Sequence, residues 1–177
     1  MKALTIYQPY AALIAAGGKR YETRSWKTSY RGPIAIHAGK NRKAFPLFGF
    51  PGPDGKPTFA SEFCRVFPSE TRKDVPFDKL FWRIYGAVIA TAELAGCWRI
   101  VSRPGADIEA AKDIPIGGEL DVPKHHPDFG RIIVPPEREL LFGDWTPGRW
   151  AWELANVATL PEPVYCNGNQ GLWEWKR

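Results

Sequence analysis

The segment GGKRYETRSW, residues 17–26, holds the side chains of this chain that are best suited to chemistry. Lys19, Arg20 and Arg24 surround Glu22, the only acid in the first 53 residues. Neighbouring cations favour the ionised form of a carboxyl group, so this pattern fits a structural ion pair. If the segment instead lines a cleft, Lys19 can donate to a carbonyl or phosphate oxygen while Glu22 positions a water molecule. Spacing alone leaves both interpretations open.

Positive charge is concentrated in the first 45 residues. They hold nine lysines and arginines against one acid, a net charge of +8, whereas the rest of the chain sums to −3. A patch of that sign raises the local concentration of polyanions, and nucleic acid is the commonest polyanion in a cytoplasm. The alternative interpretation is a solvated basic surface.

Aromatic and basic side chains alternate just after this segment. Trp26, Tyr30 and Arg31 offer rings for unpaired bases and a cation for their phosphates, as a stacking surface requires. The alternative is that Trp26 closes one end of a barrel. His37 lies inside an apolar run, which favours a hydrogen-bonded core histidine over a catalytic one.

Four short elements must position these residues. Residues 3–7 predict a strand, and residues 8–18 predict a short helix that has a proline in its first turn and a double glycine after its end. Period-2 geometry along residues 20–26 would place the charged side chains on one strand face. The apolar run 33–38 predicts a buried strand.

The rest of the chain predicts short strands separated by long loops. Helical spacing over residues 58–67 falls within a segment, 41–80, that is rich in proline and glycine and suggests an insertion or lid. The strongest strand signal is centred on Val88–Thr91, and the 104–130 loop starts with a helix pattern over Asp107–Asp113. Further strand candidates are 131–134, 148–160 and 170–175.

The stretch GDWTPGRWAW, residues 143–152, is rich in tryptophan. Asp144 followed by Thr146-Pro147-Gly148 predicts a turn. Period-2 spacing puts Trp150 and Trp152 on one side of the following strand, facing the core.

Several classes of protein are disfavoured. Cys64, Cys97 and Cys166 stand far apart, and the pair His125-His126 has no third ligand at metal-like spacing, so we expect no metal site and no disulfide framework. The phosphate-binding glycine motifs are absent, which predicts no nucleotide cofactor. No apolar run could span a membrane and no signal peptide is evident, which predicts a cytoplasmic location.

Length and composition predict one soluble domain over residues 1–177. The chain is 44 % hydrophobic and 24 % charged, which is ordinary for a globular protein. Short strands with irregular loops and few helices are typical of a small barrel with additions. Residues 41–80 and 104–130 are the expected insertions.

These residues resemble the ASCH domain, a branch of the PUA-like superfamily. Its signature GxKxxExR is matched by Lys19, Glu22 and Arg24, with Gly17 or Gly18 as the glycine, and QPY, RSW, YRGPIAIHAGK, GDWTPGRWAW and QGLWEW are similar to a bacterial and phage-associated subgroup. The resemblance implies an α+β, mainly β fold. The expected architecture is a PUA-like pseudo-barrel of about five to seven mixed strands with a short N-terminal helix and helical or loop insertions.

The resemblance also implies a cleft beside the helix, where Lys19, Glu22 and Arg24 gather. Relatives bind RNA or modified bases, and some small ASCH-like proteins are ribonucleases, or amidases that act on an acetylated cytidine. The amidase pattern uses a lysine, a threonine nucleophile and a glutamate. In this chain Lys19 is retained, Glu22 occupies the threonine position, and Thr23 would point to the opposite strand face.

Three functions follow as hypotheses. The first is binding of RNA, single-stranded nucleic acid or a modified nucleoside through a basic cleft. The second is a hydrolase acting on RNA or a modified nucleoside, with Lys19, Glu22 and Arg24 as catalytic residues, and the third is a protein-interaction scaffold that uses a tryptophan-rich surface. The predicted nucleic-acid contacts are Gln8, Tyr10, Lys19, Arg24, Trp26, Tyr30, Arg31 and Lys40.

Overall fold

The computed structural model describes residues 1–41, 58–67, 83–101, 117–120, 132–133 and 135–176. The predicted helix Asp107–Asp113 and most of the two expected insertions lie outside these ranges. Two compact units are found: Met1–Arg20, Gly32–Glu93 and Ala155–Arg177 form unit 1, and Tyr21–Arg31 and Leu94–Leu154 form unit 2. A single domain over residues 1–177 remains a prediction.

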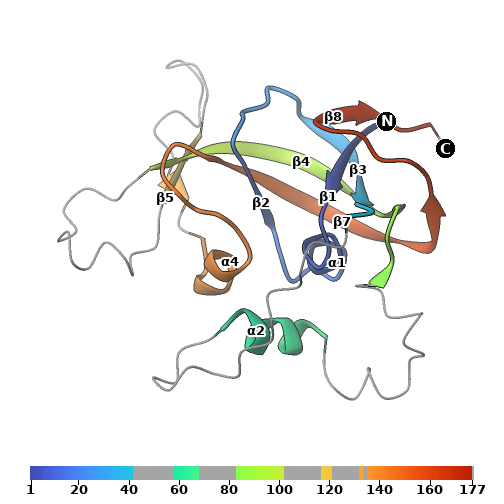
Figure 1. Cartoon of the computed structure of the whole chain (residues 1–177). Helices are drawn as coiled ribbons and strands as arrows, with labels where there is room; N and C mark the ends of the chain where they lie inside the picture. The colour runs from blue at the N-terminus through green and yellow to red at the C-terminus, as the bar shows by residue number, and fades with distance from the viewer. Residues whose placement is uncertain (42–57, 68–82, 102–116, 121–131, 134, 177) are drawn as a thin grey trace. The chain divides into compact units, whose positions relative to one another are not determined.

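Unit 1 is built on a parallel pair of strands. β1 (Lys2–Ile6) lies beside β3 (Gly32–Ala38), with Thr5 opposite His37, and pairs on its other edge with antiparallel β8 (Leu172–Glu174) (Figure 1). The five last residues of β3 are buried, as expected for a strand of a parallel pair, and this explains its continuous apolar run.

Two long strands pass through both units. β4 (Ala87–Val101) pairs with β3, and β7 (Trp150–Tyr165) pairs with β4. The sequence predicted that the strand now seen as β7 would end at residue 160, because prolines follow at 161 and 163. It continues because proline is tolerated on a strand where the ladder needs no N–H donor.

The predicted N-terminal helix is confirmed as α1 (Tyr10–Ala15). Pro9 is its N-cap residue, where a missing N–H costs little. Gly17 has φ of 73°, the left-handed conformation that glycine adopts most readily. The amides of Gly17 and Gly18 donate to the carbonyls of Ile14 and Leu13 at 2.9 and 2.8 Å, which ends the helix.

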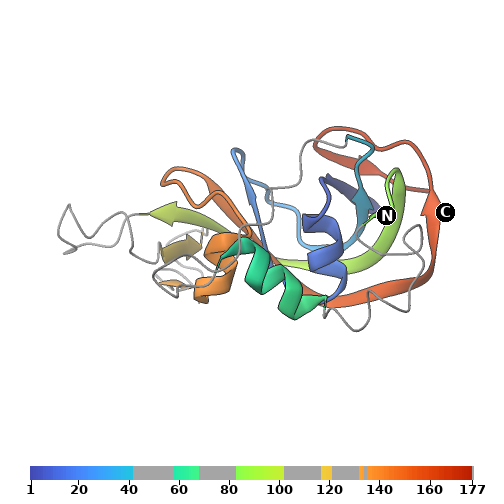
Figure 2. The same cartoon turned by 60° about the horizontal axis from the view of Figure 1, so that its bottom comes forward.

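The predicted helix within 58–67 is confirmed as α2 (Phe59–Val66). The Thr58 side chain caps the helix by accepting from the Ser61 amide, and the Thr58 amide donates to Ser61 Oγ at 2.9 Å. α2 lies beside α1 (Figures 1 and 2), and the rings of Tyr10 and Phe59 meet edge to face at 5.9 Å.

Unit 2 contains the rest of the signature segment. β2 (Tyr21–Arg24) pairs with antiparallel β7, β5 (Gly117–Leu120) pairs with β4 and with β6 (Ile132–Ile133), and α4 (Glu137–Leu141) precedes β7. Its core cluster consists of Tyr21, Trp98, Ile100, Trp145 and Ala151.

The predicted fold class is confirmed. The hydrogen-bonded order of the principal strands is β2-β7-β4-β3-β1-β8, which contains parallel and antiparallel pairs, and the described helices are short. A mainly β fold of six principal mixed strands with a short helix after β1 fits a PUA-like pseudo-barrel.

Candidate functional site

Lys19 is anchored at the end of α1. Its amide donates to the Leu13 carbonyl at 3.1 Å, and its side chain is only 1 % exposed. The Nζ atom lies 5.9 Å from the ring centroid of Tyr10, an arrangement in which the ring face attracts the ammonium. A Cβ atom on Gly18 would lie 2.5 Å from Val66 Cγ2, so α2 can approach the signature this closely only because residue 18 is glycine.

Glu22 and Arg24 form the ion pair that the sequence suggested. Alternation along β2 puts both side chains on one face, and Arg24 Nη2 lies 3.1 Å from Glu22 Oε1. Glu22 is 9 % exposed, which lets the pair act with little solvent screening. Lys19 belongs to unit 1, whereas Glu22 and Arg24 belong to unit 2.

Two tryptophans of β7 face the same side as this pair. Glu22 is directly opposite Trp152, and Arg24 is opposite Trp150. The Trp152 ring is fully buried, meets the Trp26 ring at 4.5 Å, and donates from Nε1 to the Trp26 carbonyl at 3.3 Å. The predicted core position is therefore right for Trp152.

Trp150 differs from its neighbour. It is half-buried at the first residue of β7, and the Lys27 Nζ atom lies 5.9 Å from its ring centroid. The core position predicted for Trp150 is thus only partly met, because the ring is partly exposed to solvent and the Lys27 ammonium lies near it.

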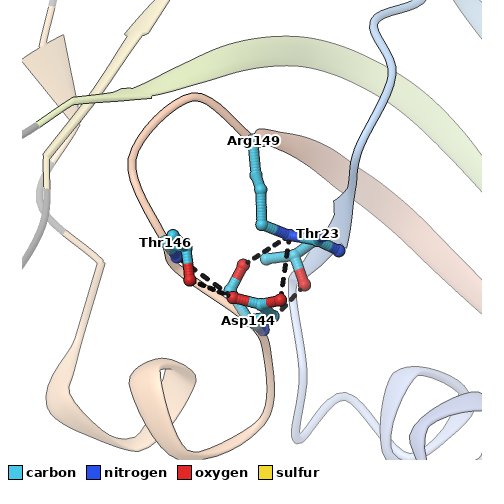
Figure 3. Close-up of polar contacts among 4 residues, drawn as sticks. All are labelled: Thr23, Asp144, Thr146 and Arg149. Atoms are coloured by element: carbon cyan, nitrogen blue, oxygen red, sulfur yellow. Dashed lines mark hydrogen bonds and ion pairs between the residues drawn. The ribbon is translucent and has the colours of Figure 1, made fainter.

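A turn before β7 holds the opposite face of β2. The Asp144 amide donates to Thr23 Oγ1 at 2.9 Å, and the Asp144 carboxylate accepts from Thr146 Oγ1 at 2.6 Å and pairs with Arg149 at 3.2 Å (Figure 3). The bond from the Thr146 hydroxyl, aided by Arg149, lowers the pKa of Asp144. The predicted turn is confirmed, and Thr23 points away from the Glu22 face.

The other predicted contact residues differ in exposure. Gln8 is buried: its Oε1 accepts from the Ala12 amide at 3.0 Å, and its Nε2 donates to the Ile84 carbonyl at 2.8 Å. Tyr10, Trp26 and Tyr30 are half-buried, and Arg31 and Lys40 are exposed. Arg31 Nη1 donates to the carbonyls of Thr28 and Tyr30 at 3.0 and 2.8 Å.

Sequence reasoning missed Glu139 in α4. This carboxylate is 1 % exposed, and its Oε2 accepts from the Tyr21 amide at 3.4 Å, so it holds the start of β2 directly before Glu22. Its backbone carbonyl accepts from Trp145 Nε1 at 2.8 Å. Nothing in the charged run ERELL (137–141) distinguishes this acid from its neighbours, because burial depends on contacts distant in sequence.

The core interpretation of His37 is confirmed. The ring is 1 % exposed, its Nε2 lies 3.2 Å from the Cys166 carbonyl oxygen, and it meets Trp173 edge to face at 5.7 Å. Burial lowers its pKa below the ordinary 6.5, and Lys40 adds to this, while the bond to Cys166 opposes it. The folded chain therefore favours the neutral ring.

This pKa predicts a loss of stability in mild acid. Below about pH 6.5 the unfolded chain takes up a proton on His37 that the folded chain resists, so the free energy of unfolding should fall by up to about 1.4 kcal/mol per pH unit until the folded pKa is reached. Urea unfolding at about pH 7.5 and about pH 5.5 measures this loss. His37→Gln should be less sensitive to pH. An equal loss in both proteins would show that other groups are responsible.

The sequence also led to expectations about metal sites, membrane spans and disulfides. Within the described ranges, no three His, Cys, Asp or Glu residues are placed to hold a metal ion, and His125-His126 lie outside those ranges. No described helix is long and apolar enough to cross a membrane. The three cysteines, Cys64, Cys97 and Cys166, all lie in the described ranges and form no disulfide there.

The scaffold hypothesis depended on an exposed tryptophan surface. Among the residues described, the exposed large apolar side chains are Met1, Tyr7 and Tyr165, and none is a tryptophan. The described part of the chain therefore gives this hypothesis no such surface.

Fold and site together define a mainly β protein of the PUA-like class, in which α1 leads into β2, the signature strand, with its Glu22–Arg24 ion pair. The chain belongs to the ASCH domain family, whose model matches residues 4–162. The family consists of PUA-like RNA-binding modules. The comparison with curated proteins found no match. The family match runs through both units and through both expected insertions.

Proposed function

We propose that this chain binds RNA, or a single modified nucleotide, through a basic cleft next to α1. The observation that carries the proposal is that residues 1–45, which have a net charge of +8, contain the signature segment of a family of RNA-binding modules. Cations at this density neutralise phosphates and release counterions, which supplies most of the sequence-independent affinity for nucleic acid.

The described side chains suggest a division of roles. The Glu22 carboxylate orients the Arg24 guanidinium, whose fork of five donors can hold a phosphate at the same time. The half-buried rings of Trp26 and Trp150 offer stacking surfaces for unpaired bases. Lys27 lies beside the second ring and is exposed to solvent, where it can reach a phosphate.

The proposal is tested by titrating the full chain into fluorescein-labelled single-stranded RNA of about 12 nucleotides and following anisotropy at several salt concentrations. We expect binding that weakens steeply as salt rises. Absence of binding at low salt, both to RNA and to a panel of modified nucleosides, would contradict the proposal.

The burial of Lys19 favours a second candidate, the hydrolase. An ammonium group that is 1 % exposed is costly to bury, and a lysine held in this way can serve as a preorganised donor to a reacting oxygen. Here Lys19 would polarise the carbonyl or phosphoryl oxygen of the substrate, and Glu22 would act as general base for water.

Two variants test the hydrolase. Lys19→Met keeps the aliphatic stem and removes the donor, and Glu22→Gln removes the base. Each should lower product formation from RNA or modified nucleosides by about 10²-fold or more, measured by mass spectrometry. Lack of product with the parent chain, or unchanged activity in both variants, would exclude this role and leave binding as the function.

A further inference from the structure

Two tyrosines of unit 1 stay exposed although most large apolar side chains of the unit are buried. Tyr7, which follows β1, is 50 % exposed, and Tyr165, the last residue of β7, is 72 % exposed. Covering an exposed tyrosine with a ligand costs little conformational entropy, because the side chain has few rotatable bonds. Exposed tyrosines are therefore suited to contact a flat partner.

Lys40 lies near both tyrosines. A Cβ atom on Gly39 would lie 3.6 Å from Tyr7 Cδ1, so the Tyr7 ring lies against the residue that precedes Lys40. The Lys40 stem runs over Gly86, where an added Cβ atom would lie 2.8 Å from Lys40 Cε. The Gly86 carbonyl accepts from the Cys166 amide at 3.0 Å, which fixes the chain next to Tyr165.

An amide-rich loop adjoins the lysine. Lys40 Nζ donates to Asn167 Oδ1 at 2.7 Å, and the loop continues with Asn169 and Gln170, which are exposed. Carboxamides both donate and accept, so they can pair with the edges of bases.

Buried contacts hold this loop in place. The His37 ring bonds the Cys166 carbonyl, and a Cβ atom on Gly168 would lie 2.5 Å from His37 Nδ1. Trp173 Nε1 donates to Thr5 Oγ1 at 3.1 Å, and Thr5 lies opposite His37 in the β1–β3 pair. A loop fixed by the core is preorganised for binding, which reduces the entropy lost when a ligand binds.

We propose that Tyr7, Lys40, Tyr165 and Asn167 form a second contact face that stacks the bases of single-stranded RNA. The inference rests on the proposed function and adds a binding face, distinct from the signature strand, to it. The rings supply stacking, Lys40 neutralises a phosphate, and the loop amides contact base edges. The exposed residues that the contacts above place beside the tyrosines are Lys40 and the loop amides Asn167, Asn169 and Gln170. A lysine and carboxamides beside two rings match the phosphates and base edges of single-stranded RNA, and among the described residues no large apolar patch marks this face as a protein-docking site.

The test uses the full chain and labelled oligouridylate and oligoadenylate of about 12 nucleotides, followed by anisotropy at fixed salt. Tyr7→Ser and Tyr165→Ser should each weaken binding by about 5- to 160-fold, since stacking contributes about 1–3 kcal/mol per base. Tyr7→Phe and Tyr165→Phe keep the rings and should bind like the parent. Lys40→Gln should instead reduce the salt slope by about 0.7.

A duplex RNA of the same length is the control ligand, because its bases are already stacked on one another and are not available to the tyrosine rings. Its affinity should not change in the serine variants, and an equal loss for duplex and single strand would overturn the stacking role. If the parent chain binds single-stranded RNA and the serine variants bind it equally well, the second face is wrong while the proposed function stands. If the parent chain binds no RNA, the proposed function itself fails.

Discussion

Replacing Trp152 by alanine is expected to lower the free energy of unfolding by about 3–5 kcal/mol. The side chain is fully buried, packs edge to face on Trp26 at 4.5 Å, and donates to the Trp26 carbonyl at 3.3 Å. Alanine leaves a large cavity and removes the hydrogen bond to the Trp26 carbonyl. Because Trp152 lies directly opposite Glu22 in the β2–β7 ladder, the loss should also displace the signature strand.

Thermal unfolding followed by tryptophan fluorescence measures this effect, with a shift of about 2–4 °C expected per kcal/mol for a chain of this size. Trp150→Ala, in the same strand, is the matched control and should lower the free energy of unfolding less, because Trp150 is only half-buried. Trp152→Phe should fall between the two, since it keeps a ring and loses the indole donor. A cost for Trp152→Ala no greater than that for Trp150→Ala would show that this ring does not hold the β2–β7 pair.

Local patterns were sufficient to predict most elements of the fold. The helix after the first strand follows from an alanine-rich run bounded by a proline and two glycines, and Gly17 adopts the left-handed conformation that the prediction required. Alternation was enough to place Glu22 and Arg24 on one face, where they form the ion pair. These features depend on neighbours within a few residues, which a sequence displays directly.

Features that depend on distant contacts could not be predicted. Glu139 is buried because its carboxylate accepts from the Tyr21 amide, 118 residues away in sequence. Lys19 is buried although lysine is almost always exposed, and the contact of Val66 with Gly18 could not be read from a signature defined by spacing. The exposure of Tyr7 and Tyr165 could not be predicted either, because the sequence does not show whether a ring at the end of a strand packs into the core or faces solvent.

Neutralising three exposed cations among the first 45 residues should weaken RNA binding about a hundredfold at about 0.1 M salt. The change is Arg20→Gln, Lys27→Gln and Arg31→Gln in one chain, all at exposed positions. Each phosphate contact with a single strand contributes about 0.7 to the slope of log K against log salt, so the slope should flatten by about 2. Anisotropy titrations between roughly 50 and 200 mM salt measure affinity and slope together.

The chain offers a control with the same change in net charge. Arg99, Arg138 and Lys176 are exposed and lie outside the first 45 residues, and replacing all three by glutamine also removes three positive charges. If the protein bound RNA only through its overall field, the two triple variants would lose affinity equally. If the contact surface lies in the first 45 residues, the control should keep nearly the parent's slope of log K against log salt. That slope depends only on the number of cations that contact phosphates. Equal slopes in the two triple variants would therefore contradict the proposed interface even if both variants bound more weakly.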